Sequence, residues 1–256
     1  MKILLTNDDG IYADGILSLY RELSRNAEVV IVAPEGQQSA VGHAISIADP
    51  IKVNPFVYKG EQLGYMVGGT PADCVKLGIA HLLPFSPDLV ISGINLGMNA
   101  GDSVIYSGTV SAATEGSIQN IPSLAVSLAT YEKPDYSFAA PFAAALADII
   151  KKNGLPAGTL LNVNIPAVPK DEIRGMAITK QARFTFKDRF HHRTDPRGRQ
   201  YFWLDYEGLE FDNDPELDIV ALKDNRISIT PLTHDLTDYS FRKKLDSWVM
   251  PELDTF

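Results

Sequence analysis

Short apolar runs alternate with amphipathic stretches along the first two thirds of the chain. Residues 2–6 (KILLT) predict a buried strand, and the DGILSLYRELSR stretch after them has helical spacing. One face of that helix carries Ile16, Leu19, Tyr20 and Leu23. The next apolar run, AEVVIVAP, predicts a second strand that ends at Pro34. A strand, helix and strand in this order predict a parallel sheet with a right-handed crossover.

The same alternation continues to about residue 169. Helical patterns occur in PADCVKLGIAHLL, near residues 109–119, and over 137–154, where Gly154 is a stop signal. Buried strands are predicted at DLVISG (88–93), SLAVSL (123–128) and TLLNVNIP (159–166). We therefore predict an α/β fold: a Rossmann-like, doubly wound, mostly parallel sheet that forms a catalytic core over residues 1–169.

The pattern changes after residue 170. The stretch from 177 to 208 alternates and contains the turn signal DPRGR, which predicts a long β-hairpin or arm. ELDIVALKDNRISITPLTHDL predicts two more short strands, so residues 170–256 form a β-rich extension. The predicted arm carries the aromatic residues Phe184, Phe186, Phe190, Tyr201, Phe202 and Trp203. An isolated hairpin is marginal in water, so the arm needs a second surface, either another subunit or the edge of its own sheet.

Composition narrows the class of protein. The 256 residues have 45% hydrophobic and 21% charged residues, as in an ordinary globular protein. A net charge of −9 argues against a protein that binds DNA non-specifically. One cysteine, Cys74, excludes an internal disulfide and fits a reducing cytoplasm. The N-terminal apolar run is too short for a secretory signal, and no stretch approaches the length of a membrane span.

Polar residues gather after several predicted strands. Asp8 and Asp9 follow the first strand, Ser39 follows the second, and Asn95 follows the strand at 88–93. Ligands of such sheets bind beyond the carboxyl ends of the strands, so these side chains are expected at one rim. Their oxygen atoms suit Mg²⁺, Mn²⁺ or Ca²⁺. The alternative is that Asp8 or Asp9 caps the following helix.

A second group at the same rim suits an anion. Asn99 lies in a glycine-rich loop, and Ser107, Gly108 and Thr109 stand where the next helix begins. Backbone N–H groups and the helix dipole favour an anion there, although Ser107 or Thr109 could equally be a routine helix cap. A metal site beside an anion site is the arrangement that phosphoryl transfer needs. Neither a P-loop nor a dinucleotide fingerprint is present.

Several long motifs make the chain resemble the SurE family (survival protein E). They cover nearly the whole length: ILLTNDDG (3–10), VIVAPEGQQSAVGHAIS (30–46), GGTPADCVKLGI (68–79), PDLVISGINLGMNAGDSVIYSGTVSAATEG (87–116), LNVNIP (161–166), DPRGRQYFWL (195–204) and ISITPLTHDLTDYS (227–240). The sequence departs from the family pattern at Ser111, where a glycine is usual, and at Asn225-Arg226, where Gly-Tyr is usual. Serine should fit a first helical turn. The Asn225-Arg226 departure bears on the local turn and on subunit contacts, not on the chemistry.

The resemblance implies a metal-dependent nucleotidase that removes phosphate from nucleoside 5′-monophosphates, with 3′-nucleotides and short polyphosphate as further candidate substrates. It implies one divalent cation per subunit, Mg²⁺ or Mn²⁺, held by Asp8, Asp9, Ser39 and Asn95. Phosphate binding is carried over onto Asn99, Ser107, Gly108 and Thr109, and catalysis onto Asp8 and Asp9. The family also implies a homodimer or homotetramer with exchanged C-terminal segments.

Three alternatives remain open at this point. The first concerns the mechanism: the metal could activate a water molecule with Asp8 or Asp9 as general base, or one aspartate could attack phosphorus. The water route is favoured because both carboxylates are committed to the metal. A haloacid-dehalogenase-type phosphatase also has aspartates after its first strand, but these are spaced Asp-x-Asp, whereas Asp8 and Asp9 are adjacent. A regulatory protein that binds nucleotide without turnover is the third.

Overall fold

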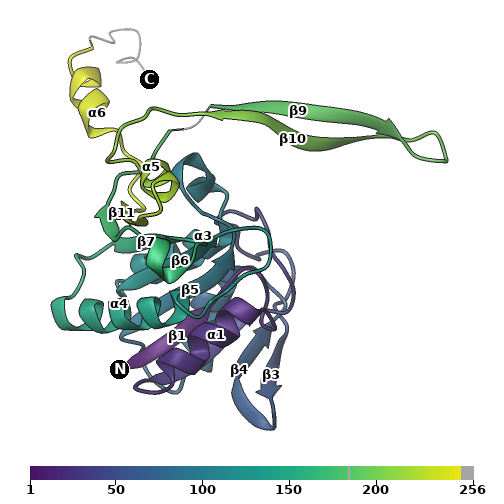
Figure 1. The fold of residues 1–256 in the computed structure, drawn as a ribbon. Coiled ribbons are helices and arrows are strands. Elements are labelled where there is room, and N and C mark those ends of the chain that lie inside the picture. The colour runs from purple at the N-terminus through teal and green to yellow at the C-terminus, as the bar shows by residue number, and fades with distance from the viewer. Residues whose placement is uncertain (184, 249–256) are drawn as a thin grey trace, which may run out of the picture.

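A computed structural model describes residues 1–183 and 185–248, and within them the main sheet has nine strands in the order β3-β4-β2-β1-β5-β6-β7-β11-β8 (Figure 1). The strands of this sheet are β1 (Lys2–Thr6), β2 (Glu28–Pro34), β3 (Val53–Tyr58), β4 (Glu61–Val67), β5 (Leu89–Leu96), β6 (Ser123–Ala129), β7 (Thr159–Pro166), β8 (Met176–Ile178) and β11 (Ile227–Thr233). The six central strands from β4 to β7 are parallel to one another.

Helices cover both faces of the sheet. The helices of the described chain are α1 (Asp14–Leu23), α2 (Pro71–Leu77), α3 (Gly108–Ile118), α4 (Ala139–Asn153), α5 (Asp218–Lys223) and α6 (Tyr239–Leu245), with a π-helical turn at Gly78–Leu82 and 3-10 turns at Gly101–Ile105 and Lys170–Glu172. α6 stands away from the sheet (Figure 1). α1 packs against α4, and α2 packs against α3. Ile16, Leu19 and Leu23 of α1 are buried in the largest core cluster, as their spacing predicts. The doubly wound α/β fold is thus confirmed.

One local prediction is wrong, and one pair of strands was not predicted. ELDIVALK was predicted as a strand, but Asp218–Lys223 forms α5. A run of four apolar residues has no readable period, so it does not distinguish a strand from one buried helical turn. The antiparallel pair β3–β4 at one edge of the sheet was not predicted. Both of its strands are short and carry mixed polar and apolar residues, which hides the alternation.

The main sheet continues past residue 169. β11 pairs antiparallel with β7, and β8 pairs parallel with β11, so both strands extend the core. The division into a core over 1–169 and an extension over 170–256 therefore stays a prediction. Asn225, one of the departures from the family pattern, has φ of 57°. Asparagine tolerates this left-handed conformation better than most other non-glycine residues, so the turn can form with Asn225 in place of the usual glycine.

The predicted hairpin is present and stands apart from the main sheet. β9 (Thr185–Thr194) and β10 (Gln200–Glu210) form a separate two-stranded antiparallel sheet, which projects from the body of the molecule as a long arm (Figure 1). The alternative in which the hairpin covers an edge of its own sheet is therefore wrong. Of the predicted aromatic residues, Phe184 lies outside the described residues, and the side chain of Phe186 is not described.

No helix among residues 1–183 and 185–248 combines the length and the apolar character needed to cross a membrane.

Candidate active site

The adjacent carboxylates lie at the carboxyl end of β1, where the chain turns sharply. Asp8 is buried and Asp9 is partly buried. The side-chain amide of Asn7 donates to the carbonyl of Gly10 at 2.8 Å, and Gly10 has φ of +97°. α1 begins only at Asp14, and its N-cap, Ala13, makes no side-chain capping bond. The alternative in which Asp8 or Asp9 caps this helix is therefore wrong.

Asp8 faces the N-terminus of α3. The hydroxyl of Thr109 donates to Asp8 Oδ1, and Thr109 is fully buried. At Gly108 an added Cβ would lie 2.7 Å from the Asp8 Cβ, so only glycine permits this close approach. Ser107 is the N-cap of α3, and its Oγ accepts from the amide of Val110 at 3.1 Å. The helix-capping alternative thus holds for Ser107, while Thr109 contacts the carboxylate.

The electrostatics of the pair favour an external cation. Desolvation by burial, opposed by the Thr109 hydroxyl and reinforced by the charge of Asp9, raises the pKa of Asp8 from 3.8 to about 6. Burial also raises the pKa of Asp9, although the amide of Leu96 donates to Asp9 Oδ2 at 3.0 Å. No lysine or arginine in the described part of the chain forms an ion pair with either carboxylate. The site therefore concentrates negative charge that the protein itself does not neutralise.

Asn95 and Ser39 come to the same rim from the two sides of β1: Asn95 lies on β5, and Ser39 lies in the loop after β2. The register between β5 and β6 shifts between Ser92 and Asn95, and such irregularities redirect a side chain at a strand end. Asn95 is buried, and its amide nitrogen donates to the carbonyl of Gly97 at 2.7 Å, which leaves the amide oxygen as the ligand atom. Ser39 is exposed and accepts from Gln37 Nε2 at 2.8 Å.

Two buried acidic residues hold the loop that carries Ser39. Glu115 of α3 contacts His43 Nε2 at 3.1 Å and Lys76 Nζ at 2.9 Å. Asp73 of α2 accepts from the amide and the hydroxyl of Ser46. Burial opposes ionisation of Glu115, but the hydrogen bonds from His43, Lys76 and Gln119 prevail and lower its pKa to about 2. Glu115 and Asp73 therefore anchor the loop as charged groups.

The same loop is joined directly to the end of β1. The amide of Gln38 donates to the carbonyl of Asp8 at 2.7 Å. This bond brings the segment with Ser39 next to the carboxylate pair. Sequence analysis did not find Glu115. The capping box of α2, Thr70 with Asp73 at its third position, is a sequence signal that would have identified Asp73.

Asn99 is held firmly by the neighbouring strands. Its amide donates to Asn164 Oδ1 at 2.7 Å, its side-chain nitrogen donates to Ser127 Oγ at 2.9 Å, and its carbonyl accepts from Asn162 Nδ2 at 2.7 Å. Asn162 and Asn164 are fully buried on β7. Sequence analysis used LNVNIP as a motif but gave these two asparagines no role. They fix the backbone of the loop in which Asn99 stands.

Comparison with known proteins supports the resemblance seen in the motifs. The family model "Survival protein SurE" matches residues 3–188. The chain belongs to the SurE family. Proteins called 5′-nucleotidase SurE are 49% identical in Syntrophobacter fumaroxidans, over 97% of this chain and 99% of that protein, and 51% identical in Moorella thermoacetica, over 97% and 96%.

A solved SurE structure confirms the fold. The crystal structure of the SurE protein from Aquifex aeolicus superimposes with a TM-score of 0.83 at 38% identity, over 96% of this chain and 98% of that one. Metal dependence is general among SurE nucleotidases. In this SurE chain no group of three or more histidine, cysteine, aspartate or glutamate side chains that could hold a metal occurs within the described residues. A cation at this rim would therefore need further oxygen ligands, such as amide, hydroxyl or water oxygens, besides the two carboxylates.

The oxygen donors of the SurE rim fit such a cation. Two carboxylates, one amide oxygen and one hydroxyl are all hard ligands, which Mg²⁺ and Mn²⁺ accept and which do not favour zinc. The raised pKa of Asp8 reflects first its burial and then the charge of Asp9, so a negative charge on Asp8 is destabilised unless a cation offsets it.

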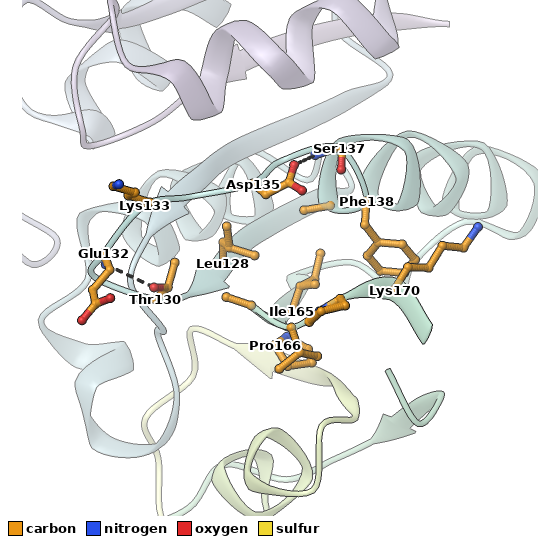
Figure 2. A pocket seen from close by; sticks show the side chains of 14 residues that line it. Leu128, Thr130, Glu132, Lys133, Asp135, Ser137, Phe138, Ile165, Pro166 and Lys170 are labelled. Carbon is orange, nitrogen blue, oxygen red and sulfur yellow. Dashed lines mark hydrogen bonds between the residues drawn. The ribbon is translucent and has the colours of Figure 1, made fainter. Parts of the chain in front are cut away.

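A cleft lies further along the same edge of the sheet. It has a volume of about 1020 Å³ and is formed beyond the ends of β6 and β7 and at the start of α4, with Leu128, Ile165 and Phe138 among its lining residues (Figure 2). None of the predicted metal or phosphate ligands lines it. In this SurE chain the carboxylate pair thus lies outside this cleft.

Proposed function

We propose that the chain is a metal-dependent phosphatase that hydrolyses nucleoside 5′-monophosphates to nucleoside and phosphate in the cytoplasm. The observation that carries this proposal is the adjacent pair Asp8 and Asp9: Asp8 is buried against the N-terminus of α3, and within residues 1–183 and 185–248 no lysine or arginine pairs with either carboxylate. The names of the SurE relatives, 5′-nucleotidase, support the choice of substrate. Activity on 3′-nucleotides and short polyphosphate is part of the proposal.

Each residue of the rim has a proposed task. Asp8, Asp9, Ser39 and Asn95 hold one Mg²⁺ or Mn²⁺ ion, which when bound polarises the phosphate and lowers the pKa of water. The amides and Ser107 hydroxyl at the start of α3 hold phosphate oxygens, and Asn99 completes this cradle. One of the two carboxylates accepts the proton of the attacking water. Attack by an aspartate is less favoured, because both carboxylates are committed to the metal.

The decisive experiment is phosphate release from nucleoside 5′-monophosphates with Mg²⁺ or Mn²⁺ and with a chelator. We expect release with metal and none with chelator. Nucleotide binding without release under every metal condition would instead indicate a regulatory binding protein. Parallel assays with 3′-nucleotides and short polyphosphate define the range of substrates.

Asn95→Ala is expected to weaken metal binding more than Ser39→Ala. An amide oxygen is a stronger donor than a neutral hydroxyl, and Asn95 is buried whereas Ser39 is exposed. Activity titrated against Mn²⁺ should show the larger shift of the half-saturating concentration for Asn95→Ala. Equal shifts, or a larger one for Ser39→Ala, would contradict the ranking.

Thr109→Val is expected to weaken metal binding, because its hydroxyl supports Asp8, and through the metal site also to weaken inhibition by inorganic phosphate. The sequence alone predicted an effect on phosphate only, but the hydroxyl donates to Asp8, so its loss alters a metal ligand as well. Removing one hydrogen bond to a charged group costs about 1.5–3 kcal/mol. Phosphate inhibition and Mn²⁺ titration on the same variant measure the two effects, and unchanged values in both assays would remove Thr109 from the site.

A homo-oligomer completes the proposal. The arm exposes Phe190, Phe202 and Trp203, each at about 60% of its surface (61%, 59% and 62%). Several exposed aromatic residues on one short ribbon mark a surface that another protein chain covers. We propose that C-terminal segments, including the arm, are exchanged between copies in a dimer or tetramer.

A further inference from the structure

The two ends of the arm meet at its base. The segment that enters β9 and the segment that leaves β10 pair through backbone bonds: the amide of Lys180 donates to Glu216 at 2.9 Å, and the amide of Asp218 donates to Lys180 at 3.1 Å. Lys180 also forms an ion pair with Asp214 at 2.7 Å. We call residues 180–182 and 214–220 the arm base.

Asp218 is the central polar group of the arm base. It is fully buried, and its carboxylate accepts from the amides of Gly101 at 2.8 Å, Ala182 at 3.1 Å and Ile219 at 2.8 Å. Gln181 Nε2 donates to the carbonyl of Gly101 at 2.9 Å. Both backbone polar groups of Gly101 are thus bound by side chains of the arm base.

Apolar contacts join the same two regions. Met98 packs against a cluster that includes Ala182, Leu217 and Val220 of the arm base. Asn99, next to Met98, is bound by Asn164 of β7. The segment 98–101 is therefore held between the core sheet on one side and the arm base on the other, and it carries a proposed phosphate ligand.

A carboxylate is an expensive group to bury in this position. No ion pair to Asp218 occurs among the side chains that the structure describes, and burial raises its pKa despite three N–H donors. An ionised acceptor binds backbone N–H groups more strongly than a neutral one. The three hydrogen bonds offset part of the cost of burial and link Gly101, Ala182 and the first turn of α5.

We propose that Asp218 is a positioning residue that couples the arm base to the Asn99 loop and thereby sets the affinity of the phosphate site. This inference rests on the proposed function of that site.

The test compares Asp218→Asn and Gln181→Met with the matched control Asp224→Asn. Asp224 is an exposed carboxylate at the other end of α5, so the control makes the same chemical change outside the link. The inhibition constant of inorganic phosphate, KM and kcat are measured for each full-length variant, together with amide hydrogen exchange of residues 98–101. Gln181→Met keeps the buried carboxylate and therefore tests the link if Asp218→Asn folds poorly.

We expect Asp218→Asn to raise the phosphate inhibition constant and KM on the order of 10-fold, with kcat little changed and exchange at Gly101 faster. Gln181→Met should act in the same direction with a smaller effect, and Asp224→Asn should match wild type. An unchanged inhibition constant in folded Asp218→Asn and Gln181→Met, with active wild type, would overturn this inference alone. Inactive wild type at every metal concentration would instead overturn the proposed function.

Discussion

Asp8→Asn and Asp9→Asn are each expected to lower turnover by at least about 100-fold, because each removes one charged ligand and one candidate proton acceptor. The fold should survive, since asparagine has the same shape and can accept the bonds that Thr109 and Leu96 donate. Phosphate release at saturating Mn²⁺ measures the effect. Turnover near that of wild type in either variant would show that its carboxylate has neither role.

Asp8→Asn should also stabilise the metal-free protein above pH 6. The pKa of Asp8 is about 6 in the folded chain and 3.8 in the unfolded one. The unfolded state therefore loses its proton first as pH rises, so ionisation destabilises the folded protein progressively between these values. The full penalty, at most about 3 kcal/mol, is present above pH 6 and absent below pH 3.8. The neutral amide that replaces the carboxylate has no such penalty.

Denaturant unfolding with a chelator at pH 4 and pH 7 measures this effect. The stability gain of Asp8→Asn over wild type should be larger at pH 7 than at pH 4. Asp14→Asn is a matched control, because Asp14 is exposed in the first turn of α1 and lies close in the chain. A gain that does not depend on pH would mean that repulsion and burial at Asp8 are not its source.

The central sheet was predictable because its signals are local. Buried parallel strands read as apolar runs, and the residues that follow them gather at one rim wherever the sheet is doubly wound. Asp8, Asp9 and Asn95 could be placed together on this ground without any knowledge of side-chain contacts. The hairpin arm was also predictable, because two β-type segments on either side of DPRGR indicate two strands joined by a turn.

The supporting residues were not predictable from local pattern. Asn164, Glu115 and Asp218 act over 65, 72 and 117 residues of sequence, on Asn99, His43 and Gly101. Nothing in a short window shows that a buried polar residue has a partner so far away. α5 was mistaken for a strand for a related reason: its tertiary contacts, rather than a readable period, decide its conformation.

The arm leaves much of its own apolar surface exposed. Phe202 and Trp203 are neighbours on β10 and point to opposite faces of the ribbon, yet both are more than half exposed. Phe190 of β9 pairs with Leu204, and these two are also exposed. A two-stranded ribbon with apolar side chains on both faces is marginal in water by itself. In the proposed oligomer, contact with another copy would bury those side chains, and a symmetric arrangement would close the assembly.

Removing residues 190–204 and joining Arg189 to Asp205 with an Asn-Gly turn is therefore expected to lower the oligomeric state. Arg189 and Asp205 are paired across the hairpin, so the join keeps the remaining register. Phe190→Ser, Phe202→Ser and Trp203→Ser combined should act alike at full length. Arg193→Ser with Arg197→Ser, at exposed polar positions, is the matched control. Light scattering should give the intact chain and the control a mass of a dimer or more, and both apolar variants a lower one. Equal masses for all four proteins would show that the arm does not mediate assembly.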